Sequence, residues 1–115
     1  MNEEILTMMN IYNTFNLDWM GDIIKSPSDL TRHHITKKQY NGEDNLNNYA
    51  LLTTKSHHLI HYLEVNYNKE YNLINNLLLE LNQSKKEPTE EYFSEMKKII
   101  KIVKKDIKNK KRKRK

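Results

Sequence analysis

Apolar residues recur at helical spacing throughout the second half of this 115-residue chain, and this periodicity constrains the fold more than any other feature. The spacing predicts a helix from Thr54, with Thr54 as its N-cap, that is interrupted at Asn66–Asn68. It predicts a second helix over about Lys69–Gln83 and a third that starts within Pro88–Glu91. The residues expected to face inward are Leu59, Ile60, Leu63 and Tyr67, then Tyr71, Ile74, Leu77, Leu78 and Leu81, and finally Tyr92, Met96, Ile99, Ile100, Val103 and Ile107. A mostly helical fold follows.

Shorter elements precede these helices. The spacing of apolar residues in Asn2–Tyr12 predicts a short amphipathic helix. Leu30–Lys37 and Tyr49–Thr53 are predicted strands, and Asn41-Gly42 between them is typical of a reverse turn because both residues tolerate positive φ. The two strands would pair as a hairpin that leads into the helix after Thr54. The predicted fold class is therefore α+β, mostly helical, with a hairpin–helix unit flanked by N- and C-terminal helices.

Composition excludes several classes of protein. The chain has no cysteine, which excludes a disulfide scaffold, a cysteine nucleophile and a zinc site built on thiolates. No segment approaches the roughly 18–20 consecutive apolar residues that a membrane-spanning helix needs. The first residues carry Glu3 and Glu4 rather than a basic export signal. We therefore expect a cytoplasmic protein that has no membrane partner.

The charge is distributed unevenly along the chain. The formal net charge is +5, but Lys97–Lys115 holds 12 basic residues and one acid, while Met1–Met96 is net −6. This asymmetry predicts a polyanionic partner held through a basic, disordered tail at 108–115, beyond a single domain at 1–107. The densest cluster comprises Lys110, Lys111, Arg112, Lys113, Arg114 and Lys115. The alternative, a solvated tail that only aids solubility, stays open.

Four histidines form the pattern with the most chemistry. His33 and His34 are adjacent on the first predicted strand, and His57 and His61 are four residues apart on the following helix. A four-residue spacing places two imidazoles on one helix face, where both can bind one metal ion. Neighbouring strand residues point to opposite faces, so His33 would face the helix when His34 faces away. Each pair alone is more often an accident of sequence than a ligand set. Together they indicate three imidazoles around one ion.

In this order and spacing, the segment Thr31–His61 resembles the ββα-metal motif of HNH endonucleases. The similarity is closest to the cysteine-free form found in colicin-type DNases and in small phage and bacterial HNH proteins. Many relatives carry a CxxC pair that binds a structural zinc ion, and Thr53 and Ser56 stand at those positions here. The resemblance implies a ββα-metal core at about 30–67.

The resemblance also implies a role for each matching residue. His33 matches the first histidine of the motif, a metal ligand, and His34 matches the general base. Asn48 matches the central asparagine, which orients the base and steadies the loop. His57 and His61 would complete the metal site. His58, about 100° around the helix from His57, is left out as a partly exposed helix residue.

The function implied by this resemblance is metal-dependent hydrolysis of DNA, by nicking or double-strand cleavage, in a bacterial or phage-encoded protein. One divalent ion is expected, Mg, Mn, Zn or Ni. A second copy of the chain or another partner would supply specificity. Arg32 either holds a substrate phosphate or pairs with an acid such as Asp29. Two alternatives remain: a non-catalytic nucleic-acid-binding protein with a structural metal site, and a helical domain whose histidines bind nothing.

Overall fold

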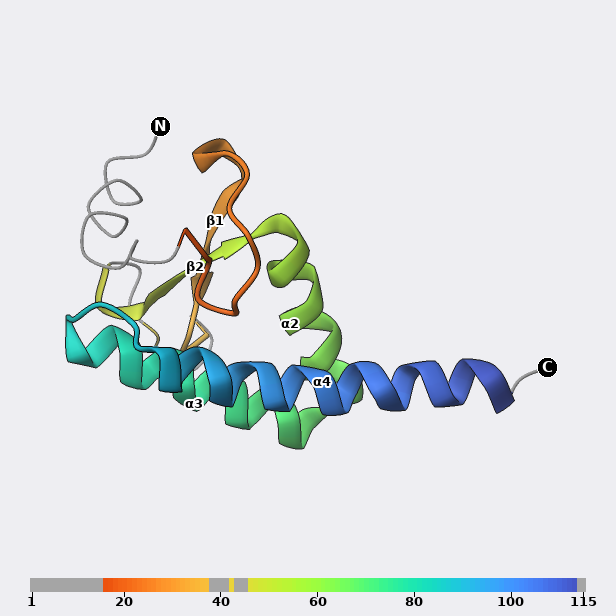
Figure 1. Ribbon diagram of the computed structural model, residues 1–115. Helices are drawn as coiled ribbons and strands as arrows, with labels where there is room; N and C mark the ends of the chain where they lie inside the picture. The colour runs from red at the N-terminus through yellow and green to blue at the C-terminus, as the bar shows by residue number, and fades with distance from the viewer. Residues whose placement is uncertain (1–15, 38–41, 43–45, 114–115) are drawn as a thin grey trace.

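An antiparallel hairpin leads directly into three helices in the computed structural model, which describes residues 16–37, 42 and 46–113 (Figure 1). In chain order the elements are the 3-10 turn η1 (Pro27–Asp29), strand β1 (Leu30–His34), the 3-10 turn η3 (Leu46–Asn48), strand β2 (Tyr49–Thr53), and helices α2 (Thr54–Asn66), α3 (Asn68–Ser84) and α4 (Glu90–Lys113). This order confirms the predicted α+β, mostly helical fold with a ββα unit. The predicted helix Asn2–Tyr12 lies outside the described residues.

The hairpin has a continuous register in which Leu30 lies opposite Thr53 and His34 lies opposite Tyr49. All five residues of β2 are buried, whereas β1 alternates more strongly between buried and exposed positions. Strand β2 therefore runs through the middle of the structure. Because β2 continues into α2 without a loop, any side chain of β1 that faces α2 is held at a fixed distance from that helix.

Strand β1 ends earlier than predicted, at His34 instead of Lys37. The reason is the side chain of Asn48, which takes the place of a strand partner. Its Oδ1 accepts a hydrogen bond from the Thr36 N–H (2.8 Å), and its Nδ2 donates to the Thr36 carbonyl (2.7 Å). Beyond them, the Gly42 N–H donates to the Lys37 carbonyl at 2.9 Å. A Cβ at Gly42 would overlap with the Thr36 carbonyl, so this close approach requires glycine.

Helix α2 begins at Thr54, and its N-cap is Thr53 and not Thr54 as predicted. The Thr53 hydroxyl accepts a hydrogen bond from the Ser56 N–H at 3.2 Å. The cap falls one residue earlier because the extended backbone at the end of β2 supplies the required geometry. The predicted interruption is confirmed, since α2 ends at Asn66 and α3 begins at Asn68.

The core lies between the hairpin and the three helices. Every residue predicted to face inward belongs to this core or packs against it. The loop before β1 adds Trp19, Met20 and Ile24, all buried. The buried side chains on the helices include Ile60, Leu63, Ile74, Leu78, Leu81, Met96 and Val103. No helix among the described residues is long and apolar enough to cross a membrane.

Helix α4 corrects the prediction of a disordered tail from residue 108, because it continues as helix to Lys113 (Figure 1). Lysine and arginine are good helix formers, and positive charge is favourable at a helix C-terminus. Tertiary contacts also support this part of the helix: the Tyr67 hydroxyl donates to Asp106 at 2.7 Å, and the Lys110 ammonium group lies 5.0 Å from the centre of the Tyr67 ring. Within the helix, Lys110 pairs with Asp106 at 3.2 Å. Residues 114 and 115 lie outside the described range.

Candidate metal centre

Three imidazoles meet between β1 and α2, as the sequence predicts. One ring nitrogen from each of His33, His57 and His61 lies within 4.8 Å of the others. His57 and His61 stack with ring centroids 4.8 Å apart, and His33 meets both rings edge-on at 5.5 and 5.8 Å. His33 is buried with 4% of its surface exposed, whereas His61 is exposed. These nitrogens are close enough to hold one metal ion together.

The second ring nitrogen of His57 is held by Thr31 on β1. The Thr31 hydroxyl donates its single hydrogen to the Leu52 carbonyl at 2.9 Å and lies 2.6 Å from His57 Nδ1. The hydroxyl must therefore accept from Nδ1–H, and we assign this tautomer to His57. Its Nε2 then carries the lone pair. Metal-binding histidines in proteins are oriented by the same kind of contact.

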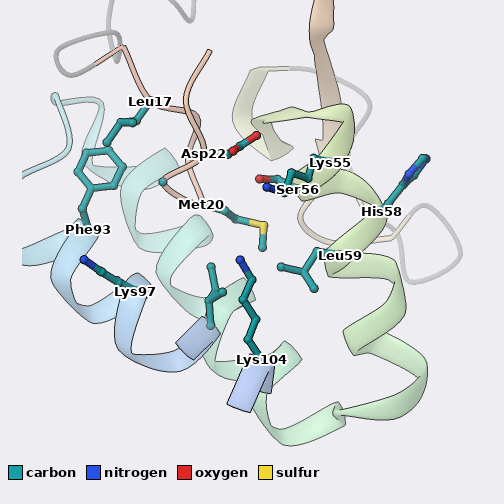
Figure 2. Close-up of a pocket in the computed structure, with 12 residues that line it drawn as sticks. Leu17, Met20, Asp22, Lys55, Ser56, His58, Leu59, Phe93, Lys97 and Lys104 are labelled. Atoms are coloured by element: carbon teal, nitrogen blue, oxygen red, sulfur yellow. The ribbon is translucent and has the colours of Figure 1, made fainter. Parts of the chain in front are cut away.

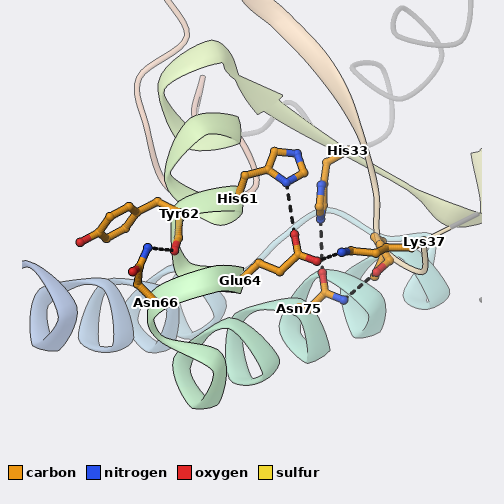
Figure 3. A network of polar contacts seen from close by, with 8 residues as sticks. His33, Lys37, His61, Tyr62, Glu64, Asn66 and Asn75 are labelled. Atoms are coloured by element: carbon orange, nitrogen blue, oxygen red, sulfur yellow. Dashed lines mark hydrogen bonds and ion pairs between the residues drawn. The ribbon is translucent and has the colours of Figure 1, made fainter. Parts of the chain in front are cut away.

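Asn75 on α3 holds His33 in a similar way. The Asn75 side-chain nitrogen donates to the Ile35 carbonyl at 2.6 Å, which fixes the direction of the amide. The amide oxygen then faces His33 Nε2 at 3.4 Å (Figure 3). We assign the proton of His33 to Nε2, which leaves the lone pair on Nδ1.

Glu64 is the partner of His61. Its Oε1 lies 3.4 Å from His61 Nδ1, and its Oε2 forms an ion pair with Lys37 (Figure 3). A carboxylate is an acceptor, so Nδ1 of His61 donates and Nε2 is left to bind an ion. Each of the three imidazoles therefore has one nitrogen bound to a neighbour and one available for a ligand.

Burial favours the neutral form of all three rings. It lowers the pKa of His33 from 6.5 to about 4, with smaller effects from the neighbouring histidines. Burial is also the largest cause that lowers the pKa of His57, and the charge of His61 lowers it further. For His61, burial again lowers the pKa most, and the charge of Lys37 is the next cause. Neutral imidazole is the form that binds metal. The donor set, its tautomers and its protonation thus fit a transition-metal ion.

These histidines line an open depression of about 380 Å³, which we call the histidine depression. Its walls are formed by Arg32, His33, His34, Lys37, His57, His61 and Glu64. His34, the predicted base, therefore lines the same space as the three imidazoles that are close enough to bind an ion, and its ring meets Tyr49 edge-on at 5.2 Å. The four histidines predicted to act together therefore line one depression.

Arg32 and Asn48 occupy different places at this site. The Arg32 guanidinium lies 5.2 Å from the centre of the Tyr49 ring at the edge of the depression. Asp29, the acid considered as its partner, accepts a hydrogen bond from the Thr54 hydroxyl at 2.8 Å. Asn48 is buried and braces the Thr36 backbone, as described above, so its loop-bracing contacts are in place. Its role in orienting His34 stays a prediction.

Sequence reasoning missed Thr31, Glu64 and Asn75. Two of them have a local signal: Thr31 shares a strand face with His33, and Glu64 lies one helical turn after His61. Asn75 lies 42 residues from His33, and no spacing rule connects the two. Only the packing of α3 against the end of β1 brings that amide to the site.

A second depression lies on another face of α2, and we call it the lysine groove (Figure 2). It has a volume of about 680 Å³ and is lined by residues of α2, α4 and the loop before β1. Leu17, Met20, Leu59, Phe93 and Ile100 are its apolar lining residues, and Lys55, His58, Lys97 and Lys104 are its basic ones. His58, which the sequence analysis left out of the metal site, is one of the residues that line this groove, and its ring projects outward from α2 at the edge of the groove (Figure 2).

The predicted basic cluster is divided by the structure. Lys110 contacts Asp106 and Tyr67 on the folded body, with its ammonium group 5.0 Å from the Tyr67 ring centre. Lys111 is exposed on α4. The backbone of Arg112 and Lys113 is helical, and Arg114 and Lys115 lie outside the described residues.

Comparison with known proteins found no match: no family model fits the chain, and neither a curated protein nor a solved structure is significantly similar to it.

Proposed function

We propose that this protein is a metal-dependent endonuclease of the HNH kind, which hydrolyses DNA phosphodiester bonds by nicking or double-strand cleavage. The observation that carries the proposal is the histidine depression, where three imidazoles able to bind one ion share an open space with a fourth, His34. The resemblance of Thr31–His61 to the ββα-metal motif supports the same assignment.

His33, His57 and His61 would hold one divalent ion. When bound, such an ion neutralises charge on the phosphoryl oxygens and stabilises the departing alkoxide. Three neutral nitrogen donors favour Zn or Ni, whereas the family resemblance implies Mg or Mn. The proposal therefore keeps all four ions as candidates for the experiment below.

The remaining residues of the depression act on substrate and water. His34 would accept the proton of the attacking water at a ring nitrogen, because imidazole can act as a base near neutral pH. Arg32 and Lys37 would bind the non-bridging phosphate oxygens. Asn48 would keep the segment after β1 in place and, through the family resemblance, orient His34.

Helix α4 provides a surface for the DNA backbone. Lysines recur along one face at three- and four-residue spacing, and all of them are exposed: Lys97, Lys101, Lys104, Lys108 and Lys111. At a rise of about 1.5 Å per residue, this lysine stripe is about 21 Å long. Together with the terminal cluster Lys110–Lys115 it would hold DNA largely through phosphate contacts. The compartment we propose is the cytoplasm of a bacterial cell.

Plasmid cleavage tests the proposal directly. Supercoiled plasmid is incubated with the metal-free protein and with each of Mg²⁺, Mn²⁺, Zn²⁺ and Ni²⁺. We expect relaxed or linear product with at least one ion, and none with chelator. His34→Ala should lower the rate by roughly 10²–10⁴-fold, the usual range for a general base.

His58→Ala is the matched control, since it removes an imidazole from the same helix outside the histidine depression and should cleave saturating DNA like wild type. Equal rates for wild type and His34→Ala would contradict the assigned base. Binding of metal and DNA without cleavage under any of the four ions would favour the alternative, a non-catalytic nucleic-acid-binding protein with a structural metal site.

A further inference from the structure

We propose that Glu64 is the positioning residue of the histidine depression: it fixes the ring of His61 and keeps Lys37 beside the imidazoles as a phosphate-binding group. This inference rests on the metal site of the proposed function. It assigns two roles at that site: Glu64 sets the affinity for the metal ion, and Lys37 sets the affinity for substrate phosphate.

His61 is the metal-binding imidazole that most needs an external restraint. Its side chain is 54% exposed, whereas His33 is buried and His57 is held by a short contact of 2.6 Å to Thr31. An exposed imidazole loses rotamer freedom when it binds an ion, and that loss weakens binding unless a neighbour has already restricted the ring. The carboxylate of Glu64, one turn later on α2, lies 3.4 Å from Nδ1 of His61.

The second oxygen of Glu64 pairs with Lys37 (Figure 3). Lys37 belongs to the segment after β1, and its side chain is 37% exposed, while that of Glu64 is 19% exposed. One partly buried carboxylate therefore contacts an imidazole on one side and an ammonium group on the other. The contact sets the position of a flexible lysine that would otherwise extend into solvent.

Glu64 is also the only acid among the described residues that line either of two adjoining depressions. One is the histidine depression, and the other, of about 340 Å³, is lined by Ile35, Thr36, Lys37, Glu64, Asn68, Tyr71, Asn72 and Asn75. Lys37 and Glu64 line both. A phosphate that contacts Lys37 would therefore lie where the two depressions meet.

The role of Glu64 is indirect. The group of mutually close donor atoms contains nitrogens of three histidines and no carboxylate oxygen. Glu64 instead acts on the site through His61, and it balances the charge of Lys37 next to the position of the ion. This is the role of a positioning residue, and it predicts that substitutions of Glu64 and of Lys37 change metal affinity differently.

Zinc affinity of the full chain, measured by competition with a chelator and without DNA, tests this role. Glu64→Ala should weaken Zn²⁺ binding 10–100-fold, the usual cost of losing a group that orients a metal-binding histidine. Glu64→Gln should weaken it less, because the amide oxygen still accepts from Nδ1–H of His61. Lys37→Met should bind Zn²⁺ as tightly as wild type or more tightly, since it removes a positive charge. Glu95→Ala, which breaks the exposed pair with Lys98, is the control and should change nothing.

The effect of Glu64 on the metal site and the effect of Lys37 on substrate binding are measured separately. In plasmid cleavage, Lys37→Met should raise KM and leave kcat close to wild type, because it removes a phosphate contact and no metal contact. The absorption spectrum of bound Co²⁺ should change in Glu64→Ala and stay the same in Lys37→Met.

A Zn²⁺ affinity of Glu64→Ala within threefold of wild type would overturn the proposal. Equal losses of Zn²⁺ affinity in Glu64→Ala and Lys37→Met would also overturn it, because the Glu64–Lys37 ion pair, and not the contact of Glu64 with His61, would then support the site. Circular dichroism of the metal-free variants checks their folding, and Glu64→Gln, nearly the same shape as glutamate, serves if Glu64→Ala does not fold. Failure of wild type to cleave DNA would refute the proposed function and leave these zinc measurements valid.

Discussion

Helix α2 separates two depressions with different chemistry. On one face, His57 and His61 join His33 in a small polar space, where each imidazole is hydrogen-bonded to a neighbouring side chain. On another face, His58 and Lys55 line a larger groove with an apolar floor (Figure 2). The lysines of that groove, Lys55, Lys97 and Lys104, form no ion pair with any described residue. Helix α2 thus lies between an organised site and a set of solvated charges, most of them on α4.

The difference shows that neighbouring positions of one residue type can have unrelated roles. His57 and His58 are adjacent in sequence but lie about 100° apart around α2, so His57 contacts Thr31 on β1 whereas His58 lines the lysine groove. Contacts in the histidine depression are directional and each joins one ring nitrogen to one side-chain oxygen, so they should depend on pH and on single atoms. The lysine charges act over longer distances and are screened by salt.

The largest expected effect is a loss of stability of the metal-free protein in acid. His33 has a pKa of about 4 in the folded chain and 6.5 as its ordinary value, so the unfolded chain binds the additional proton between these pH values. Stability supplied by neutral His33 is complete above pH 6.5 and is lost as the pH falls toward 4. The shift corresponds to about 3 kcal/mol.

Denaturant unfolding in chelator between pH 7 and pH 4 checks this expectation, with His33→Asn as the comparison. The variant should lose less stability over that range than wild type. Asp18, whose pKa is raised by burial, titrates in the opposite sense, so the difference between the two proteins is the quantity of interest. Parallel curves would show that His33 is protonated in the folded chain as easily as in the unfolded one.

Metal should stabilise the histidine face and leave the lysine face unaffected. A ligand at 100 times its Kd stabilises a folded protein by about 2.7 kcal/mol. At that concentration of the ion that it binds best, wild type should gain this amount of stability. His57→Ala and His61→Ala should gain almost none, since two imidazoles hold a divalent ion weakly. Thermal unfolding with and without metal makes the measurement. His58→Ala should retain the full gain, and a comparable gain in all variants would place the ion elsewhere.

Local sequence patterns predicted most of the fold and the three histidines that lie close enough to bind one ion. Helical spacing identified the inward residues of α2, α3 and α4, because burial of one helix face imposes a period of 3.6 residues. The pairing of β1 with β2 and the direct step into α2 made the meeting of His33, His57 and His61 predictable. Thr53 shows how precisely such patterns predict a helix end, since the N-cap of α2 lies one residue before its predicted position.

Long-range packing accounts for what the sequence did not predict. Asn75 on α3 contacts His33 and the Ile35 carbonyl at the end of β1, 42 and 40 residues away in sequence. Lys37, in the segment after β1, pairs with Glu64 on α2. Helix α4 continues beyond residue 108 because Tyr67, from the junction of α2 and α3, holds Asp106. Charge density alone indicated a flexible tail there. Tertiary contacts decided otherwise.

The smallest expected effect concerns the lysine face, and it is a change in salt dependence. Each phosphate contact contributes about −0.9 to the slope of log affinity against log salt for duplex DNA. Lys97→Gln with Lys104→Gln removes two charges of the lysine stripe, both beside the groove. We expect the slope to become shallower by about two.

Lys98→Gln with Lys105→Gln is the matched control, because it removes two lysines with the same seven-residue spacing from a different face of α4 and changes the net charge equally. Its slope should stay near that of wild type, since Lys98 already pairs with Glu95 at 3.5 Å and neither residue lines the groove. Fluorescence anisotropy with a short duplex over a range of salt concentrations gives both slopes. Equal decreases in the two variants would mean that DNA responds to net charge and not to the stripe. A decrease confined to the first variant would place the DNA backbone along α4 on the side that faces the lysine groove.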